Sequence, residues 1–321
     1  MTEMPPVPPA PAHTQAPVQI LSLYAETSLH PGSGSSTGVI DLPVQRERHT
    51  GFPIIPPTGV KGTLRQQAEL LWPKTDGKLH PTVAVLFGPA TAAEEGLHAG
   101  AIAFGEGRLM AFPVRSSSQV FVWVTCALVI DRLARDLRLV GITLPTLTEA
   151  PRNTQAFAPT APDNRLARAV ILEDLSFNLQ ERDDVAQLAI EMARFLPESY
   201  VVMRSKIQRH LVVVSDQDYE HLVRTSTQVS ARVALNERKT TTGDGGNLWY
   251  EETLPRDCLF SAVLRFDRPR AAADGIETAQ DVQQKLHELV THQPYVQVGG
   301  NESVGQGWCV IHTLSQNGRA T

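Results

Sequence analysis

The chain has 321 residues, of which 42% are hydrophobic and 20% charged, and its formal net charge is −5. This length and apolar content predict a soluble globular protein with a large core. The negative net charge argues against a uniformly basic nucleic-acid-binding protein, so any anion site must be local. The three cysteines are far apart and indicate reduced thiols in the cytoplasm. No apolar run has the length of a membrane span, so we expect no membrane partner.

The N-terminal part of the chain predicts a tail, a strand, a long loop and a helix. Residues 1–17 are rich in proline and are expected to be a disordered tail. Residues 18–27 alternate in polarity, which is typical of a strand. A loop follows, and Thr58 is expected to cap a helix that ends near Trp72.

The middle of the chain predicts mixed strands and helices. A polar insertion is expected at 73–100 around a short apolar piece at 83–87, and a hairpin is expected from 101–104 and 108–114 across Gly105 to Gly107. Proline and polar residues predict a loop at 145–162. The other expected elements are strands at 120–124, 169–179 and 210–214 and helices at 125–137, 183–195 and 216–224.

The C-terminal part predicts a projecting β-hairpin followed by a strand, a helix and a closing strand. Residues 228–235 and 248–255 flank a turn-rich tip, NERKTTTGDGGN. The remaining expected elements are a strand at 258–266, a helix at 278–290, a strand end at 296–298, the glycine-rich GGNESVGQG and a strand at 308–313. Without regular βαβ alternation, this mixture predicts an α+β fold with a mostly antiparallel sheet.

One stretch, 29–65, combines six glycines, the carboxylate of Asp41 and a string of cations. Glycines let backbone N–H groups approach a ligand closely, and a helix N-terminus attracts anions. The stretch therefore predicts a cradle for a phosphate backbone with one acid, Asp41, inside it. The alternative is an ordinary surface loop rich in glycine and proline.

Two short matches to catalytic motifs are treated as chance. Gly34 to Gly38 spells G-x-S-x-G, but that motif needs a strand before it and a helix directly after it, and neither is expected here. His287 and His292 are spaced five residues apart, which puts their rings on different faces of a helix, so a zinc site is not expected.

The string LHPGSGSSTGVIDLPVQRERHTGFPIIPPTGVKGTLR closely resembles the signature of the RAMP superfamily, and within it the backbone subunit of type III-B CRISPR (Cmr) effector complexes. The return strand LWYEETLP and the glycine-rich GGNESVGQG match in the same order, so the resemblance covers about residues 20–314. It implies a ferredoxin-like, RRM-related core in a single elaborated domain at 18–321, with residues 228–255 as a thumb. The implied partners are CRISPR RNA, complementary target RNA, further copies of the chain and other Cmr subunits.

The resemblance also implies an activity: an RNA-guided endoribonuclease that cuts target RNA at regular intervals through Asp41, with His30 at the second matching loop position. RNA carries its own nucleophile, the 2′-OH, so cleavage needs mainly geometry and charge stabilisation. A carboxylate is a poor base at neutral pH, so Asp41 is expected to hold a divalent metal ion, Mg²⁺ or Mn²⁺. Glu252 is a further catalytic candidate, or else an ordinary edge-strand charge; His30 packing the loop is likewise an alternative.

A set of residues is expected to contact RNA, mostly at guide phosphates, whose recognition does not depend on sequence. Solvated surface charges are the alternative for the cations among them. They are Lys61, Arg65, Arg46, Arg48, His49, Gly299, Gly300, Asn301, Gly305, Gly307, Arg238, Lys239 and Trp249.

Two other functions stay open at this stage. The first is a catalytically silent subunit that only scaffolds RNA in the same type of assembly; the presence of Asp41 favours the nuclease. The second is a stand-alone RRM-like binder, but the aromatic strings of that module are absent from the sequence.

Overall fold

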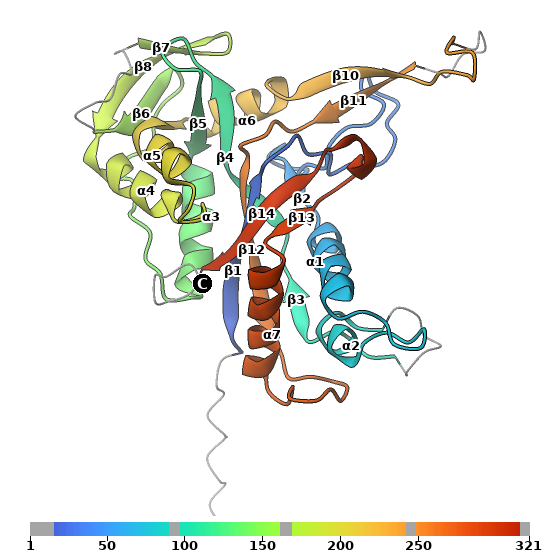
Figure 1. Ribbon diagram of the computed structural model, residues 1–321. Coiled ribbons are helices and arrows are strands. Elements are labelled where there is room, and N and C mark those ends of the chain that lie inside the picture. Colours follow the sequence, from blue (N-terminus) through green and yellow to red (C-terminus); the bar gives the residue numbers. More distant parts are fainter. Residues whose placement is uncertain (1–15, 90–96, 161–168, 242–247, 315–321) are drawn as a thin grey trace, which may run out of the picture.

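A computed structural model describes residues 16–89, 97–160, 169–241 and 248–314. These residues form a 12-stranded sheet with helices on both faces and a separate two-stranded hairpin (Figure 1). The predicted tail lies outside the described ranges except for its last two residues, and so does the second half of the expected hairpin tip, 242–247. Within the described ranges, no helix is both long and apolar enough to cross a membrane.

Four strands at the centre of the sheet have the ferredoxin-like order. The sheet runs β14-β1-β12-β4, and each neighbouring pair is antiparallel. In the chain, α1 lies between β1 and β4, and α7 lies between β12 and β14, which gives the βαββαβ arrangement. The bounds are β1 Val18–Ala25, α1 Pro57–Leu71, β4 Gly107–Arg115, β12 Leu259–Phe266, α7 Ala279–His292 and β14 Trp308–Leu314.

Both faces of β1 are buried, which explains its apolar sequence. Leu21 and Leu23 contribute to the core that also contains residues of α1 and α7, whereas Ile20 and Tyr24 contribute to a second core with residues of α3, α4 and α5. Successive side chains of a strand point to opposite faces, so this strand separates two cores. Figure 1 shows the two sets of helices on either side of the sheet.

A second group of elements, inserted between β4 and β12, extends the sheet. Its strands continue the order as β5-β9-β6-β8-β7. The sheet is mixed, because β5 with β9 and β6 with β8 pair in parallel; the sequence patterns did not predict these pairings. The bounds are β5 Phe121–Cys126, α3 Ala127–Arg138, β6 Gln155–Pro159, β7 Ala169–Leu172, β8 Leu175–Arg182, α4 Asp183–Ala193, α5 Val201–His210, β9 Leu211–Val214 and α6 Asp216–Thr225.

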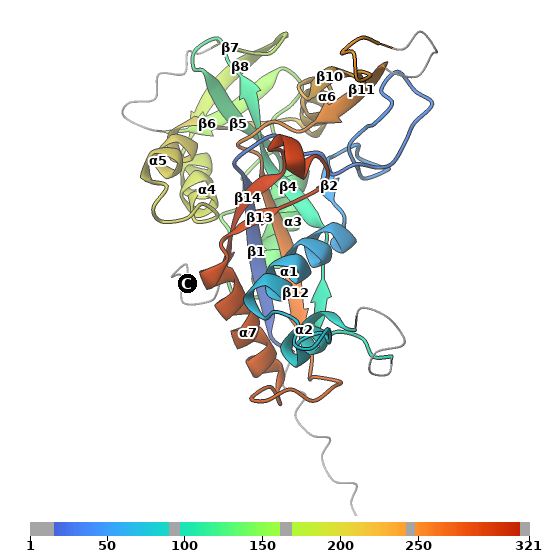
Figure 2. The same ribbon diagram turned by 45° about the vertical axis from the view of Figure 1, so that its right-hand side comes forward.

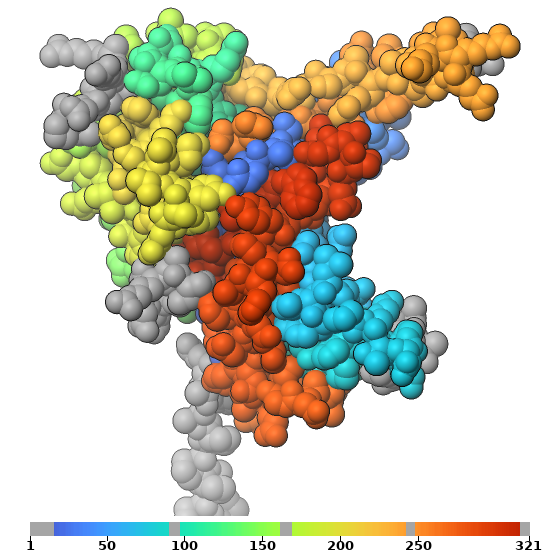
Figure 3. Space-filling model, viewed as in Figure 1, coloured from blue at the N-terminus to red at the C-terminus, as the bar shows by residue number. Residues whose placement is uncertain are grey.

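The predicted hairpin is present and projects from the body of the molecule as an arm (Figures 1 and 3). Its strands are β10, Gln228–Val233, and β11, Leu248–Thr253, paired antiparallel. The remaining elements are β2 Ile54–Ile55, α2 Pro81–Phe87, β3 Ile102–Phe104, β13 Tyr295–Gln297 and the 3₁₀ turn η1 Glu302–Val304.

The expected hairpin at 101–114 was wrong. Both β3 and β4 pair with β12, so they form one interrupted strand and not two strands facing each other. At the interruption, Gly105 N donates to Val263 O at 2.8 Å, and a Cβ on Gly105 would lie 2.9 Å from that oxygen. The glycines therefore allow close approach to β12 here and do not make a turn.

Four local expectations are also corrected. Thr58 does not cap α1, because the helix begins at Pro57 with Pro56 as its N-cap, and the ring of Pro57 presets the helical φ. The apolar piece at 83–87 belongs to helix α2, and the expected loop 145–162 contains β6. The expected strand at 169–179 is the hairpin β7–β8, which turns at Glu173 with φ of 53°. The sequence patterns also missed helix α5, whose only buried residue is Ile207 and which therefore lacks a clear apolar stripe.

Candidate active site

The long loop after β1 lies along the open edge of β11, the return strand of the hairpin (Figure 2). Leu42 N donates to Tyr250 O, and Glu252 N donates to Leu42 O, each at 3.0 Å. Residues 250 and 252 turn their backbone groups toward the loop, while β10 pairs with the other edge of β11. The loop thus joins the hairpin as a short third strand.

Asp41 is fixed to this edge by its side chain. Its Oδ2 accepts a hydrogen bond from Tyr250 N at 2.7 Å, across a separation of 209 residues in the chain. Its Oδ1 has no hydrogen-bond partner within the described residues, and the side chain is half-buried. A charge-assisted bond of this kind orients the carboxylate and leaves one oxygen available.

His30 is fixed to the same edge. Its Nδ1 lies 2.7 Å from Glu252 O. A carbonyl oxygen can only accept, so Nδ1 carries the proton and Nε2 of the neutral ring keeps its lone pair. The ring is held tightly, because a Cβ on Gly32 would lie 2.8 Å from Nε2 and one on Gly300 would lie 3.3 Å from Cδ2.

The structure therefore brings Asp41 and His30 together at one strand, β11. They are anchored at Tyr250 and Glu252, two residues apart on β11, and two residues of a strand span about 6.8 Å. A single rigid element thus sets the relative position of Asp41 and His30, two of the three predicted catalytic side chains.

Glu252 is buried and paired on both carboxylate oxygens. Oε1 accepts from Arg46 Nη2 at 2.6 Å and from Thr227 Oγ1 at 2.9 Å, and Oε2 accepts from Val44 N at 3.0 Å. Its residue is only 3% exposed. These contacts fit a role in holding the loop better than a direct part in the chemistry.

The three cations of the loop lie in different surroundings. Arg46 faces inward, where Nη1 also donates to Gly51 O and Val223 O, so its guanidinium is occupied. Arg48 and His49 are exposed; Arg48 has no hydrogen bond or ion pair within the described residues, whereas His49 lies 3.1 Å from an arginine nitrogen of α3 and 3.8 Å from Glu47. Of the three cations, only the exposed Arg48 and His49 keep the geometry expected of RNA contacts.

Lys61 and Arg65, on the second and third turns of α1, also differ. Arg65 donates to Glu69 Oε1 and to Gly88 O, both at 2.9 Å. Lys61 lines a hollow of the surface together with Arg270, and it forms no ion pair within the described residues. Lys61 is therefore the freer of the two cations.

The glycine-rich loop 299–307 uses most of its backbone donors inside the protein. Gly300 N donates to His30 O and Gly307 N to Ser28 O, while Gly305 N closes the 3₁₀ turn. Asn301 donates from Nδ2 to Glu251 Oε1 at 2.6 Å. Gly299 has φ of 81°, and a Cβ there would lie 2.3 Å from His30 O. These contacts support the His30 segment and leave few N–H groups for phosphates.

The hairpin has one apolar face and one polar face. Val229, Val233, Leu248 and Tyr250 lie on the same face by their cross-strand pairing, and each is between 43% and 57% exposed. The opposite face carries Arg232 paired with Trp249 and, nearer the base, Ser230 paired with Glu251. Arg238 and Lys239 are exposed in the turn beyond β10, where the N–H groups of both donate to Asn236. They are far along the arm from Asp41.

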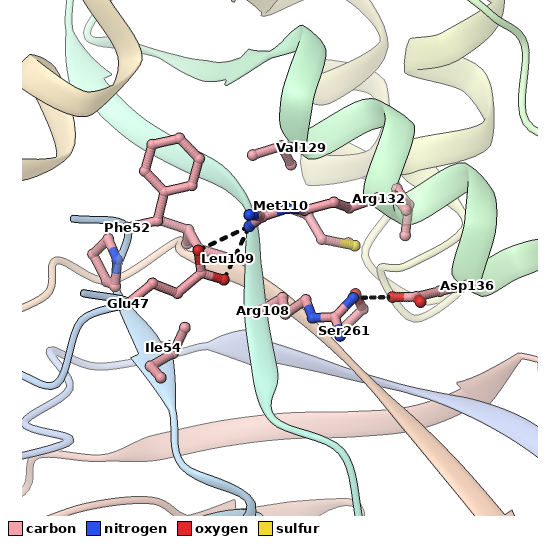
Figure 4. A pocket seen from close by; sticks show the side chains of 12 residues that line it. Glu47, Phe52, Ile54, Arg108, Leu109, Met110, Val129, Arg132, Asp136 and Ser261 are labelled. Atoms are coloured by element: carbon pink, nitrogen blue, oxygen red, sulfur yellow. Dashed lines mark hydrogen bonds and ion pairs between the residues drawn. The ribbon is translucent and has the colours of Figure 1, made fainter. Parts of the chain in front are cut away.

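An ion-pair network that the sequence patterns did not indicate lies between β4, α3 and the loop (Figure 4). Glu47 pairs with Arg132, and Arg108 with Asp136, each at 2.9 Å. Burial raises the pKa of Asp136; for Glu47, burial is outweighed by hydrogen bonds from Thr50 and Arg132, which lower its pKa. The network fastens the loop to α3. Glu47 and Arg132 lie 85 residues apart in the chain, and Arg108 and Asp136 lie 28 apart, so no local spacing could reveal the network.

No group of three or more histidine, cysteine, aspartate or glutamate side chains suited to a metal ion occurs within the described residues. Asp41 Oδ1, which has no hydrogen-bond partner within the described residues, is available as a metal ligand. Any ion held here would need most of its ligands from RNA phosphates and water, which is a common arrangement for Mg²⁺.

The strand order, the inserted second group and the arm define an elaborated ferredoxin-like protein with an acid-bearing loop at the base of a hairpin. Comparison with known families agrees with this class. The model of the RAMP superfamily matches residues 22–310, and the chain belongs to this superfamily.

Individual relatives are consistent with that assignment. A protein of Pyrococcus furiosus named CRISPR system Cmr endoribonuclease Cmr4 is 37% identical over 305 residues, which is 91% of this chain and 94% of the relative. The crystal structure of oligomeric Cmr4 from Pyrococcus furiosus matches with a TM-score of 0.65 and 28% identity, over 93% of this chain and 99% of that chain. A type III-B Cmr-beta structure bound to cognate target RNA matches with a TM-score of 0.70 at 19% identity, over 93% and 98% of the two chains, and shows the shared fold alone.

Proposed function

We propose that this chain is the RNA-guided endoribonuclease subunit of a type III-B CRISPR effector, which lines up along CRISPR RNA in several copies and cuts complementary target RNA. The observation that carries the proposal is the joint anchoring of Asp41 and His30 on the open edge of β11. The 37% identity to a Cmr endoribonuclease over nearly the whole chain supports it independently.

The arm gives this site a way to act on a strand of RNA. The hairpin projects from the body directly beside the loop that carries Asp41 (Figures 2 and 3). A regular duplex holds each 2′-OH out of line with the bond to be broken, so cleavage requires a local distortion. The exposed apolar face of the arm is suited to pack against an unstacked base and to bring the neighbouring phosphate to Asp41.

The reaction needs no nucleophile from the protein. The 2′-oxygen of the target forms a bond to the adjacent phosphorus, and the bond from phosphorus to the 5′-oxygen breaks. The 2′-OH loses its proton and the 5′-oxygen gains one, which gives a 2′,3′-cyclic phosphate and a 5′-OH. We assign Asp41 to the reacting phosphate and His30 to holding the loop in place.

A divalent ion fits this site in one way. Asp41 would hold it through its available oxygen, with RNA and water supplying the other ligands. Such an ion, Mg²⁺ or Mn²⁺, supplies charge stabilisation at the phosphate. Arg48 and Lys61 form no ion pair within the described residues and are therefore available for guide phosphates, and the exposed His49 lies beside Arg48 in the same loop.

The test is target cleavage by the assembled complex with an Asp41→Asn subunit. Asparagine keeps an oxygen for the N–H of Tyr250 but removes the charge, so the loop should stay in place. We expect at least a 100-fold loss of cleavage rate with unchanged guide binding. Asp174→Asn, an exposed aspartate in the β7–β8 turn, is the control.

The same experiment tests the alternative, a scaffold without catalytic activity. A wild-type complex that binds complementary RNA but leaves it intact with both Mg²⁺ and Mn²⁺ supports the scaffold. Cleavage at unchanged sites by the Asp41→Asn complex would instead show that another residue does the chemistry.

A further inference from the structure

Glu252 is the point at which the catalytic loop, the hairpin and the body of the protein meet. Its backbone N and O hold Leu42 and His30, and its carboxylate holds Val44 and Arg46. The same carboxylate also accepts a hydrogen bond from the hydroxyl of Thr227, the residue just before β10. Every one of these partners except Thr227 lies in the loop after β1.

The spacing of these contacts fixes the register of the loop on β11. Leu42 and Val44 are two residues apart on the loop, and both are bound to Glu252, one through its backbone and one through its side chain. A slip of the loop along β11 would break both bonds and would also move Asp41 away from Tyr250 N. Because the carboxylate is buried, the three hydrogen bonds that it accepts, one of which is the ion pair with Arg46, cannot be replaced by water.

We propose that Glu252 is a positioning residue for target cleavage: it locks the loop in the one register that presents Asp41 beside His30, and it ties that register to the base of the hairpin. This inference rests on the proposed function. It adds that the geometry of the active loop depends on β11, so that displacement of the arm is transmitted to Asp41 through one strand. Arg46 acts with Glu252 as its counter-ion.

Glu252→Gln is the sharpest test because it changes charge and donor pattern but not size. A glutamine amide has one acceptor oxygen and one donor NH₂, whereas this site presents N–H donors to both oxygens. The NH₂ group of the glutamine would then face either the Arg46 guanidinium or the Val44 N–H, so that two donors would point at each other. The loop should still form but lose its fixed register.

The expected result is a 10- to 100-fold lower single-turnover rate at saturating target RNA, with unchanged target affinity, since a misplacement of about 1 Å costs roughly this much. Glu47→Gln is the matched control: Glu47 is a buried carboxylate of the same loop, paired with an arginine and a threonine, but it does not contact β11. It should lower the melting temperature about as much as Glu252→Gln while leaving the rate unchanged.

A double-mutant cycle with Arg46→Lys separates positioning from general loss of stability. If both residues act through one ion pair, the double variant should be no slower than the slower single variant. The inference fails if Glu252→Gln cleaves at the wild-type rate, or if Glu47→Gln slows cleavage equally. If wild-type complex does not cleave at all, the proposed function fails instead, so the two failures are distinguishable.

Discussion

Arg46→Ala separates a structural role of this cation from the RNA contact that the sequence predicted. In the structure the guanidinium neutralises the buried carboxylate of Glu252 and donates to two backbone carbonyls, Gly51 O and Val223 O. Removing one partner of a buried ion pair costs about 3–5 kcal/mol, because the other charge is left uncompensated. Arg46 keeps 19% of its side chain exposed, so we expect the lower end, about 3 kcal/mol.

The measurement is urea unfolding of the full chain, with Arg48→Ala as the matched control. Arg48 lies two residues away in the same loop and is exposed, so its removal should change the unfolding free energy by less than about 0.5 kcal/mol. We expect the reverse pattern in RNA binding, where Arg48→Ala weakens affinity at low salt. If Arg46→Ala leaves stability within about 1 kcal/mol of wild type and weakens RNA binding instead, the structural assignment is refuted.

Three further predictions concern other parts of the molecule. Lys61→Ala should reduce the slope of log affinity for guide RNA against log salt concentration by about 0.7–0.9. Arg65→Ala should instead lower stability with little change in that slope. An unchanged slope for Lys61→Ala would show that α1 is not part of the RNA interface. Gly299→Ala should lower the free energy of unfolding, measured in urea, by about 1–3 kcal/mol, because a φ of 81° is unfavourable for alanine and its Cβ would meet His30 O. His312 is buried, and burial lowers its pKa, so protonation favours the unfolded chain: stability should be full above the ordinary histidine pKa of about 6.5 and fall as pH drops below it. His312→Gln should lessen the drop in melting temperature between pH 7.5 and 5.5, and an equal drop in both proteins would contradict this.

Local patterns were enough to predict many of the elements. Alternating and helical periodicities located β1, the hairpin β10–β11, β12, α4, α6 and α7, because these signals depend only on neighbours along the chain. The same patterns failed where the partner strand decides the outcome. Residues 101–114 look like a hairpin in sequence but form one interrupted strand on β12.

The candidate site likewise contains residues that the sequence predicted and residues whose role only the tertiary structure decided. The sequence by itself pointed to Asp41 and His30 through the resemblance of their loop to a known signature, and the structure holds both on one strand. It could not tell Arg46 from Arg48, which stand two residues apart with the same chemistry. Only the tertiary structure decided that one neutralises Glu252 while the other stays exposed, because that difference depends on β11, a strand about 200 residues further along the chain. A short string of residues specifies its charges and its backbone preferences, but the partner of each charge is set by which distant segment packs against it.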